Sequence, residues 1–143
     1  MVSPIKYNAK VLIIRRKPDP EYERFLELEK RVGHNGRGPF LLYGMDLDIS
    51  ELRKIAEPKG LREVDIFKKR LENHLKKNRY DMVLTQGGLV IVDSIRKYHK
   101  GLVVTYGLVQ GGDIRDCDAG ISFWEIGNGD TLENFVGEVL WML

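Results

Sequence analysis

Short runs of branched apolar residues alternate along the chain with stretches of helical periodicity, and this alternation constrains the fold more than any other feature. The apolar runs are residues 10–16, 40–43, 82–85, 102–109 and 121–126. Runs without polar alternation are typical of strands that are buried on both faces of a parallel sheet. The pattern predicts an α/β fold, a three-layer sandwich in which a mostly parallel sheet of about five strands carries helices on both faces. No helical pattern separates the last two runs, so we expect the last strand to be an antiparallel edge strand.

Capping residues and helix breakers indicate where the helices begin and end. Asp48 and Glu51 have the spacing of a capping box, and Pro58 with Gly60 would end the helix that they begin. The predicted helices, each with its capping residue, are 20–32 (Asp19), 49–57 (Asp48), 66–78 (Asp65) and 131–143 (Asp130). Residues 89–99 also fit a helix, with a strand of a hairpin around Gly87-Gly88 as the alternative.

Length and composition place the chain among globular proteins. A chain of 143 residues with 43% hydrophobic residues suits a single α/β domain over 1–143 and is too apolar to be disordered. No run approaches the roughly 18 apolar residues that a membrane span needs, and the first residues lack a signal peptide, so we expect a cytoplasmic protein without a membrane partner. A single cysteine, Cys117, excludes a disulfide framework. Abundant Lys, Arg and Glu with only two Gln are typical of thermophiles.

The small net charge of +2 hides a strong asymmetry along the chain. Residues 1–100 carry 22 Lys and Arg against 14 Asp and Glu, whereas residues 101–143 carry one basic residue against seven acidic ones. The basic surplus is densest in residues 53–79, with ten Lys and Arg against four acids. Such an asymmetry indicates either a face for an anionic partner or basic helices whose outer faces are simply solvated.

The ends of the predicted strands hold the candidate ligand-binding residues. In open parallel sheets, ligands bind beyond the carboxyl ends of the strands, where the strand order reverses. Two predicted strands are followed by the same tripeptide, Gln-Gly-Gly, 24 residues apart, and glycine pairs let the backbone approach an anion closely. The alternative is that they are ordinary turns, because no established phosphate-binding glycine motif is present. The candidate contacts are Arg15, Arg16, Gln86, Gly87, Gly88, Gln110, Gly111 and Gly112.

An acidic loop follows the second tripeptide. Asp113, Asp116 and Asp118 lie within six positions, and Mg²⁺ prefers one or two carboxylates together with phosphate oxygens. A Mg²⁺ site and a polar turn both explain this loop, since short polar side chains suit turns. No catalytic pattern is present, so the residues predict no reaction, and whether the chain is an enzyme stays open.

Three functional hypotheses follow from these patterns. The first is the binding of an anionic small ligand, a phosphate-bearing molecule such as a nucleotide, at the carboxyl ends of the strands. The second is DNA binding through a helix-turn-helix at 48–78 with a hairpin at 82–92, which would present Lys68, Lys69, Arg70, Lys76 and Lys77. The third is a structural role as a homodimer, joined through the apolar C-terminal helix that ends at Trp141, Met142 and Leu143.

Overall fold

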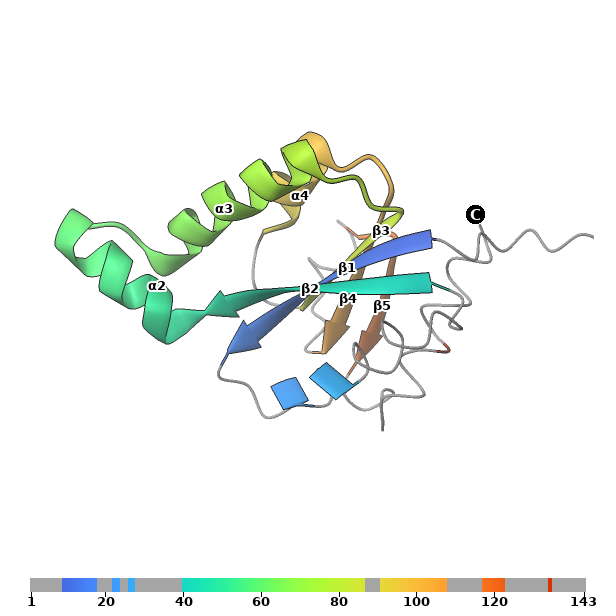
Figure 1. The fold of residues 1–143 in the computed structure, drawn as a ribbon, viewed down its shortest axis with the longest axis horizontal. Helices are drawn as coiled ribbons and strands as arrows, with labels where there is room; N and C mark the ends of the chain where they lie inside the picture. The colour runs from blue at the N-terminus through green and yellow to red at the C-terminus, as the bar shows by residue number, and fades with distance from the viewer. Residues whose placement is uncertain are drawn as a thin grey trace, which may run out of the picture.

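A single parallel sheet organises the protein (Figure 1). The computed structural model describes residues 9–17, 22–23, 26–27, 40–86, 91–107, 117–122 and 134. Five strands pair in the order β2-β1-β3-β4-β5, and every neighbouring pair is parallel, which confirms the predicted α/β fold with its five-stranded sheet. The strands are β1 (Ala9–Lys17), β2 (Phe40–Asp48), β3 (Met82–Gln86), β4 (Leu102–Gly107) and β5 (Ala119–Ser122).

Because all strands run the same way, the sheet has two chemically different edges. The carboxyl edge is formed by the last residues of the strands, from Asp48 on β2 to Ser122 on β5. The amino edge is formed by their first residues, from Phe40 to Ala119. Strand β1 lies between β2 and β3, and its register places Arg15 beside Asp46. These two edges are the places where the loops, and therefore the candidate sites, must lie.

The helices follow from local signals, with one correction. Helix α2 (Ile49–Ala56) begins directly after β2, and the Asp48 carboxylate accepts the Glu51 N–H at 3.2 Å, as the capping box predicts. A 3₁₀ turn, η1 (Glu57–Lys59), follows, and Gly60 adopts the left-handed φ of 63° that ends it. Helix α3 (Glu63–Lys77) begins before Asp65, the residue predicted to cap it. Its N-cap is Arg62, and Asp65 lies in the first turn, where its negative charge interacts favourably with the helix dipole.

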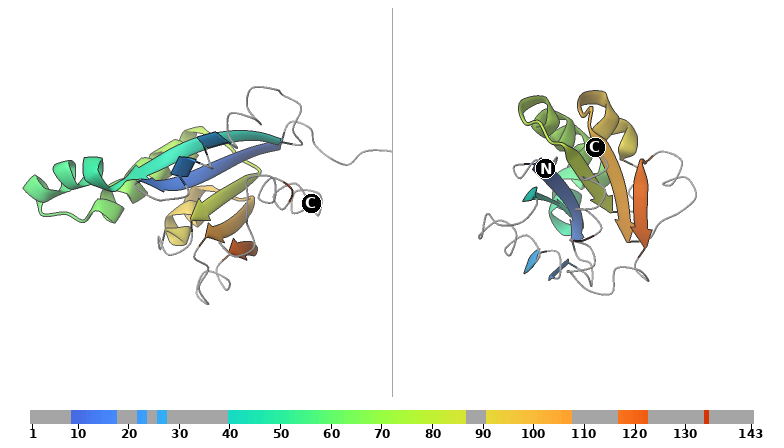
Figure 2. Two further views of the ribbon diagram at one scale, coloured as in Figure 1. Left: turned by 90° about the horizontal axis from the view of Figure 1, so that it is seen from below. Right: turned by 90° about the vertical axis from the view of Figure 1, so that its right-hand side faces the viewer.

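Helices α2, α3 and α4 lie together on one face of the sheet (Figure 2). Helix α3 packs between α2 and α4 (Val92–Tyr98), and its buried stripe of Phe67, Leu71 and Leu75 faces β1 and β3. The helix-side core consists of these residues with Leu12, Ile14, Leu47, Leu52, Val83, Ile91, Ile95 and Val103. Helix α4 confirms the helical interpretation of residues 92–98 over the hairpin. No helix in the described ranges is long and apolar enough to span a bilayer.

The other face of the sheet is buried as well. The second-face core contains Ala9, Val11, Ile13, Leu42, Met82, Leu84, Val104, Tyr106 and Ile121, all from strands. Within the residues that the structure describes, no helix contributes to this core, so the predicted helical layer on this face is not established. The predicted helices at 20–32 and 131–143 lie outside the described residues, apart from Tyr22, Glu23, Leu26, Glu27 and Asn134, which are helical.

Two strand predictions are wrong. Strand β2 does not end at Gly44 but continues to Asp48, because its pairing with β1 persists from Ala9 to Lys17. The last strand is not antiparallel: β5 pairs parallel to β4, with Val104 beside Ala119. The chain therefore returns to the amino edge before β5 begins, where the Asp118 N–H donates to the Val103 carbonyl oxygen at 2.8 Å. The sequence between β4 and β5 shows no helical periodicity, so it contains no pattern that predicts the direction of β5.

Candidate ligand-binding site at the carboxyl edge

The strand order reverses between β1 and β3. From β1 the chain first continues to β2 on one side, and then crosses to β3 on the other side. In parallel α/β sheets the crevice at such a switch point, outside the carboxyl ends of the two strands, is where ligands bind. The ends of β1 and β3 carry Arg16, Lys17 and Gln86, so two of the predicted contacts, Arg16 and Gln86, lie at this switch point.

Arg16 and Gln86 are in direct contact there. The backbone N–H of Arg16 donates to Oε1 of Gln86 at 2.9 Å, which joins the ends of the two strands. The Gln86 side chain is buried, whereas the Arg16 side chain is exposed. The Arg16 guanidinium makes no ion pair with any residue that the structure describes. The backbone of Arg16 is therefore held in place while its charge faces solvent.

Arg15 has a different role from the one the sequence predicts. It is only 5% exposed, and its Nε pairs with Oδ1 of Asp46 at 2.9 Å. Asp46 also accepts the Tyr22 hydroxyl at 2.5 Å, and the Arg15 guanidinium carbon lies 5.4 Å from the centre of the Tyr22 ring. The hydrogen bond to Asp46 raises the pKa of Tyr22 to about 12, so the phenol stays protonated as a donor. The positive charge of Arg15 is therefore balanced by Asp46 within the protein.

Two buried polar residues at this edge escape the sequence analysis. The Tyr106 hydroxyl on β4 donates to the Ile14 carbonyl oxygen on β1 at 2.7 Å, reaching across β3. The Thr105 side chain is fully buried, and its Oγ1 has no hydrogen-bond partner among the residues that the structure describes. Thr105 pairs with Thr85 in the sheet, and Thr85 lies one residue before the carboxyl end of β3. The sequence signal is the pair of hydroxyl residues, Thr105 and Tyr106, near the end of the otherwise apolar β4, since buried hydroxyls without partners are rare.

Asp118 does not lie with these residues. Its Oδ2 accepts the Val103 N–H at 2.8 Å and an Arg96 N–H at 3.2 Å, which places it at the amino edge. The sequence makes Asp118 a candidate Mg²⁺ ligand beyond the carboxyl end of β4, but Asp118 lies directly before β5, which begins at the opposite end of the sheet. Among the residues described, no group of three metal-binding side chains is present. The other predicted site residues, Gly87, Gly88, Gln110, Gly111, Gly112, Asp113 and Asp116, lie outside the described residues, as does Trp141.

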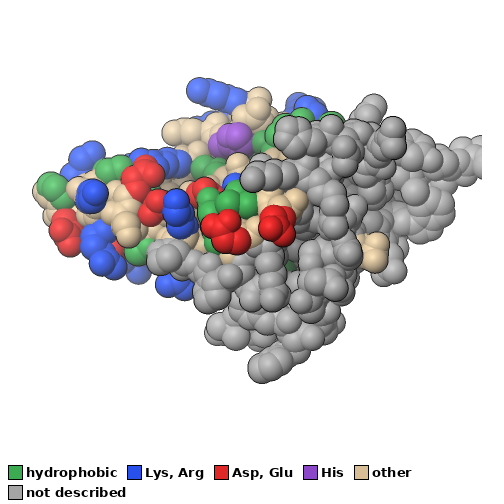
Figure 3. All heavy atoms as spheres, turned by 60° about the horizontal axis from the view of Figure 1, so that its bottom comes forward, with side chains coloured by type: hydrophobic (Ala, Val, Ile, Leu, Met, Phe, Trp, Pro, Cys, Tyr) green, Lys and Arg blue, Asp and Glu red, His purple; other side chains and the backbone are tan. Residues whose placement is uncertain are grey.

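The helix-turn-helix interpretation is only partly matched by the structure. Helices α2 and α3 are joined by a short turn, but the predicted hairpin at 82–92 is wrong, because β3 is a central parallel strand. The basic side chains of α3 are partly neutralised: Lys68 pairs with Asp93 at 3.0 Å, and Arg70 pairs with Glu51 at 2.9 Å. Figure 3 shows acidic and basic side chains interleaved on the visible face of this region. That face lacks the uniform positive charge of a duplex-binding surface.

Comparisons with known proteins add no functional information. No family model, no curated protein and no solved structure matches the chain. Function must therefore be inferred from the geometry of the described residues alone.

Proposed function

We propose that the protein binds an anionic small ligand that carries a phosphate group, a nucleotide in the first instance, at the carboxyl edge of its sheet. The observation that supports this most directly is the contact between Arg16 and Gln86 at the switch point of the strand order. A parallel sheet presents its binding crevice there, and Arg16 supplies an exposed guanidinium, whose planar donors suit phosphate.

The neighbouring residues support the same proposal. Lys17 is a second exposed cation beside Arg16, and its Nζ lies 5.6 Å from the centre of the Tyr22 ring. The Asp46 carboxylate balances the buried Arg15, which leaves Arg16 and Lys17 as the exposed cations at the end of β1. The proposal is one of binding and includes no reaction.

A thermal-shift experiment tests the proposal. Nucleotides, with and without Mg²⁺, are added to the wild-type protein and to two variants, Arg16→Ala and Lys69→Ala. Arg16→Ala keeps the backbone N–H that donates to Gln86 and removes the side chain with its guanidinium. Lys69→Ala removes an exposed cation from α3, away from the switch point, and is the matched control.

A ligand at 100 times its Kd stabilises the folded state by about 2.7 kcal/mol, which raises Tm by several degrees. We expect this rise in the wild type and in Lys69→Ala, and its loss in Arg16→Ala. The proposal fails if no nucleotide raises Tm, or if Arg16→Ala responds like the wild type.

A further inference from the structure

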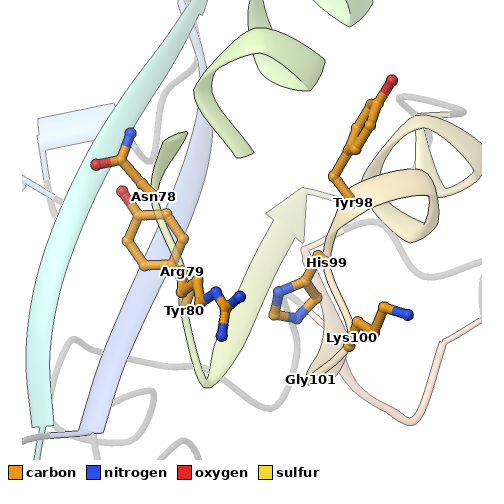
Figure 4. A pocket seen from close by; sticks show the side chains of 7 residues that line it. All are labelled: Asn78, Arg79, Tyr80, Tyr98, His99, Lys100 and Gly101. Atoms are coloured by element: carbon orange, nitrogen blue, oxygen red, sulfur yellow. The ribbon is translucent and has the colours of Figure 1, made fainter. Parts of the chain in front are cut away.

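The amino edge of the sheet, opposite the site proposed above, contains two adjoining pockets. Both are lined by Asn78, Arg79 and Tyr80, the residues that connect α3 to β3. One pocket, of about 340 Å³, extends toward Lys10 on β1 and Tyr43 on β2. The other, of about 260 Å³, extends toward the segment 98–101 between α4 and β4 (Figure 4). Arg79 and Tyr80 therefore form a partition between two small cavities, and we call the two cavities together the amino-edge groove.

The ionised side chains that line the amino-edge groove all carry positive charge. They are Lys10, Lys77, Arg79 and Lys100, and no Asp or Glu is among the described residues that line either pocket. None of the four forms an ion pair within the described part of the chain. The neighbouring carboxylate of Asp81 is turned to the backbone instead, where its Oδ2 accepts the Lys10 N–H at 2.8 Å. The carboxylates of Asp81 and Asp118 lie near His99, but the four cations outnumber them, so an anion is the ligand that the groove attracts.

Aromatic side chains lie among these cations. Tyr43 and Tyr98 belong to opposite pockets and are 42% and 39% exposed, so each presents ring surface to solvent. Tyr80 between them is held firmly: its hydroxyl bonds Nε2 of His74 at 2.6 Å, and its ring meets Tyr43 edge-on with centroids 6.0 Å apart. The groove thus has one partly exposed tyrosine on each side of the partition, and the Lys76 Nζ lies 5.0 Å from the ring centre of Tyr98, so a base can stack only on the other face of that ring.

The size of the pockets indicates a ligand with repeating units. Each pocket lies at or below the lower end of the range for small-molecule sites, roughly 300–1,000 Å³. Two adjacent small cavities, each with a tyrosine and cations, and with Arg79 shared, match a chain in which planar groups and phosphates alternate. Proteins bind single strands in this way, with basic side chains along the phosphates and aromatic rings against the bases.

We propose that the amino-edge groove binds single-stranded nucleic acid, with Arg79 on the backbone phosphate between two nucleotides whose bases stack on Tyr43 and Tyr98. A single strand fits better than a duplex, because paired bases have no free ring face to stack on a tyrosine. The surface differs from the helix-turn-helix considered above, since it is built from strand ends and loops rather than from an exposed helix.

Fluorescence anisotropy with a labelled oligothymidylate and a labelled oligouridylate, each of about eight nucleotides, tests this proposal. The variants are Arg79→Ala and Tyr98→Ala, with Lys69→Ala as the matched loss of one exposed cation. Arg16→Ala serves as the control for the carboxyl edge. We expect Arg79→Ala to weaken binding about tenfold and to reduce the slope of log K against log salt by about 1. Tyr98→Ala should weaken binding by about five- to a hundredfold with an unchanged salt slope, while Lys69→Ala binds like the wild type. Arg16→Ala measures any contribution of the carboxyl edge.

Four results would overturn the proposal. The first is the absence of binding at low salt. The second is equal affinity for the matching duplex, which would indicate a general attraction for polyanions. The third is equal affinity for a free mononucleotide in the Arg16→Ala variant, where the carboxyl-edge site no longer contributes, which would make the groove a small-anion site. The fourth is loss of oligonucleotide binding in Arg16→Ala, which would move the contact to the carboxyl edge.

Discussion

The side-chain oxygen of Gln86 accepts the backbone N–H of Arg16, and this hydrogen bond of 2.9 Å joins the carboxyl ends of two neighbouring parallel strands. It lies where the strand order reverses, so the position of the Arg16 backbone depends on a side chain from β3. The bond links the stability of the sheet to the geometry of the proposed ligand site.

Replacing Gln86 tests this link. Gln86→Met keeps most of the buried volume but removes the acceptor, so we expect the free energy of unfolding to fall by about 1 kcal/mol. Gln86→Ala should cost more, because it also leaves a cavity. Urea denaturation measures both variants. If Gln86→Met is as stable as the wild type, the bond does not hold the strand ends together.

Replacing Thr105 is expected to raise the stability of the protein rather than lower it. Its buried hydroxyl lacks a partner in the described part of the chain, so Thr105→Val removes an unsatisfied polar group at nearly constant shape. We expect the free energy of unfolding to rise by about 1 kcal/mol. Thr85→Val is the neighbouring control and should bring a smaller gain, since the Thr85 hydroxyl has a weak bond of 3.5 Å to the Gln86 carbonyl oxygen. Calorimetry of both variants measures the difference, and a loss of stability in Thr105→Val would contradict the prediction.

The buried His99 makes stability depend on pH. Burial lowers the pKa of His99, while its Nε2 lies 2.8 Å from the Leu102 carbonyl oxygen. As pH falls, the unfolded chain therefore takes up a proton before the folded protein does. We expect stability to be fully present above the ordinary histidine pKa of about 6.5 and to decline below it, by at most about 1.4 kcal/mol per pH unit for this one proton.

Denaturation curves between about pH 5.5 and pH 7.5 check this prediction. His99→Gln should show a flatter profile than the wild type. His74→Gln should flatten it less, because the pKa of the half-buried His74 is also lowered by burial but more of its ring meets water. An identical slope in wild type and His99→Gln would rule out His99 as the cause.

Gly101 is expected to tolerate no side chain. A Cβ at this position would overlap the Asp81 carbonyl oxygen and lie 3.0 Å from Cε1 of His99. That carbonyl oxygen accepts the Leu102 N–H at 3.0 Å, so the backbone is not free to move away. We expect Gly101→Ala to lower the free energy of unfolding by about 1–3 kcal/mol.

Gly60→Ala is the informative comparison for Gly101→Ala. Its Cβ would meet open space, and only the positive φ opposes it, at a cost of about 1 kcal/mol. Chemical denaturation of the two variants ranks them. Equal losses would show that the contact with Asp81 relaxes easily.

Local signals in the sequence predict the individual elements well. The apolar run at 10–16 is β1, and the capping box of Asp48 and Glu51 starts α2 where expected. The alternation of strands and helices also predicts the parallel sheet. Each of these signals comes from residues that are only a few positions apart, so the linear sequence is enough to predict the element.

Tertiary structure alone decided which residues meet. The chain itself determined that Arg16 and Gln86 each lie at the end of a strand, but only the strand order made them neighbours. Asp118 shows the converse, since its place depends on the direction of β5, which no local pattern encodes. The amino-edge groove brings together Lys10, Tyr43, Arg79 and Tyr98 from four separate elements or loops. Propensity and capping depend on residues a few positions apart. The pairing of strands depends instead on residues far apart in the sequence, because the whole sheet must bury both of its faces.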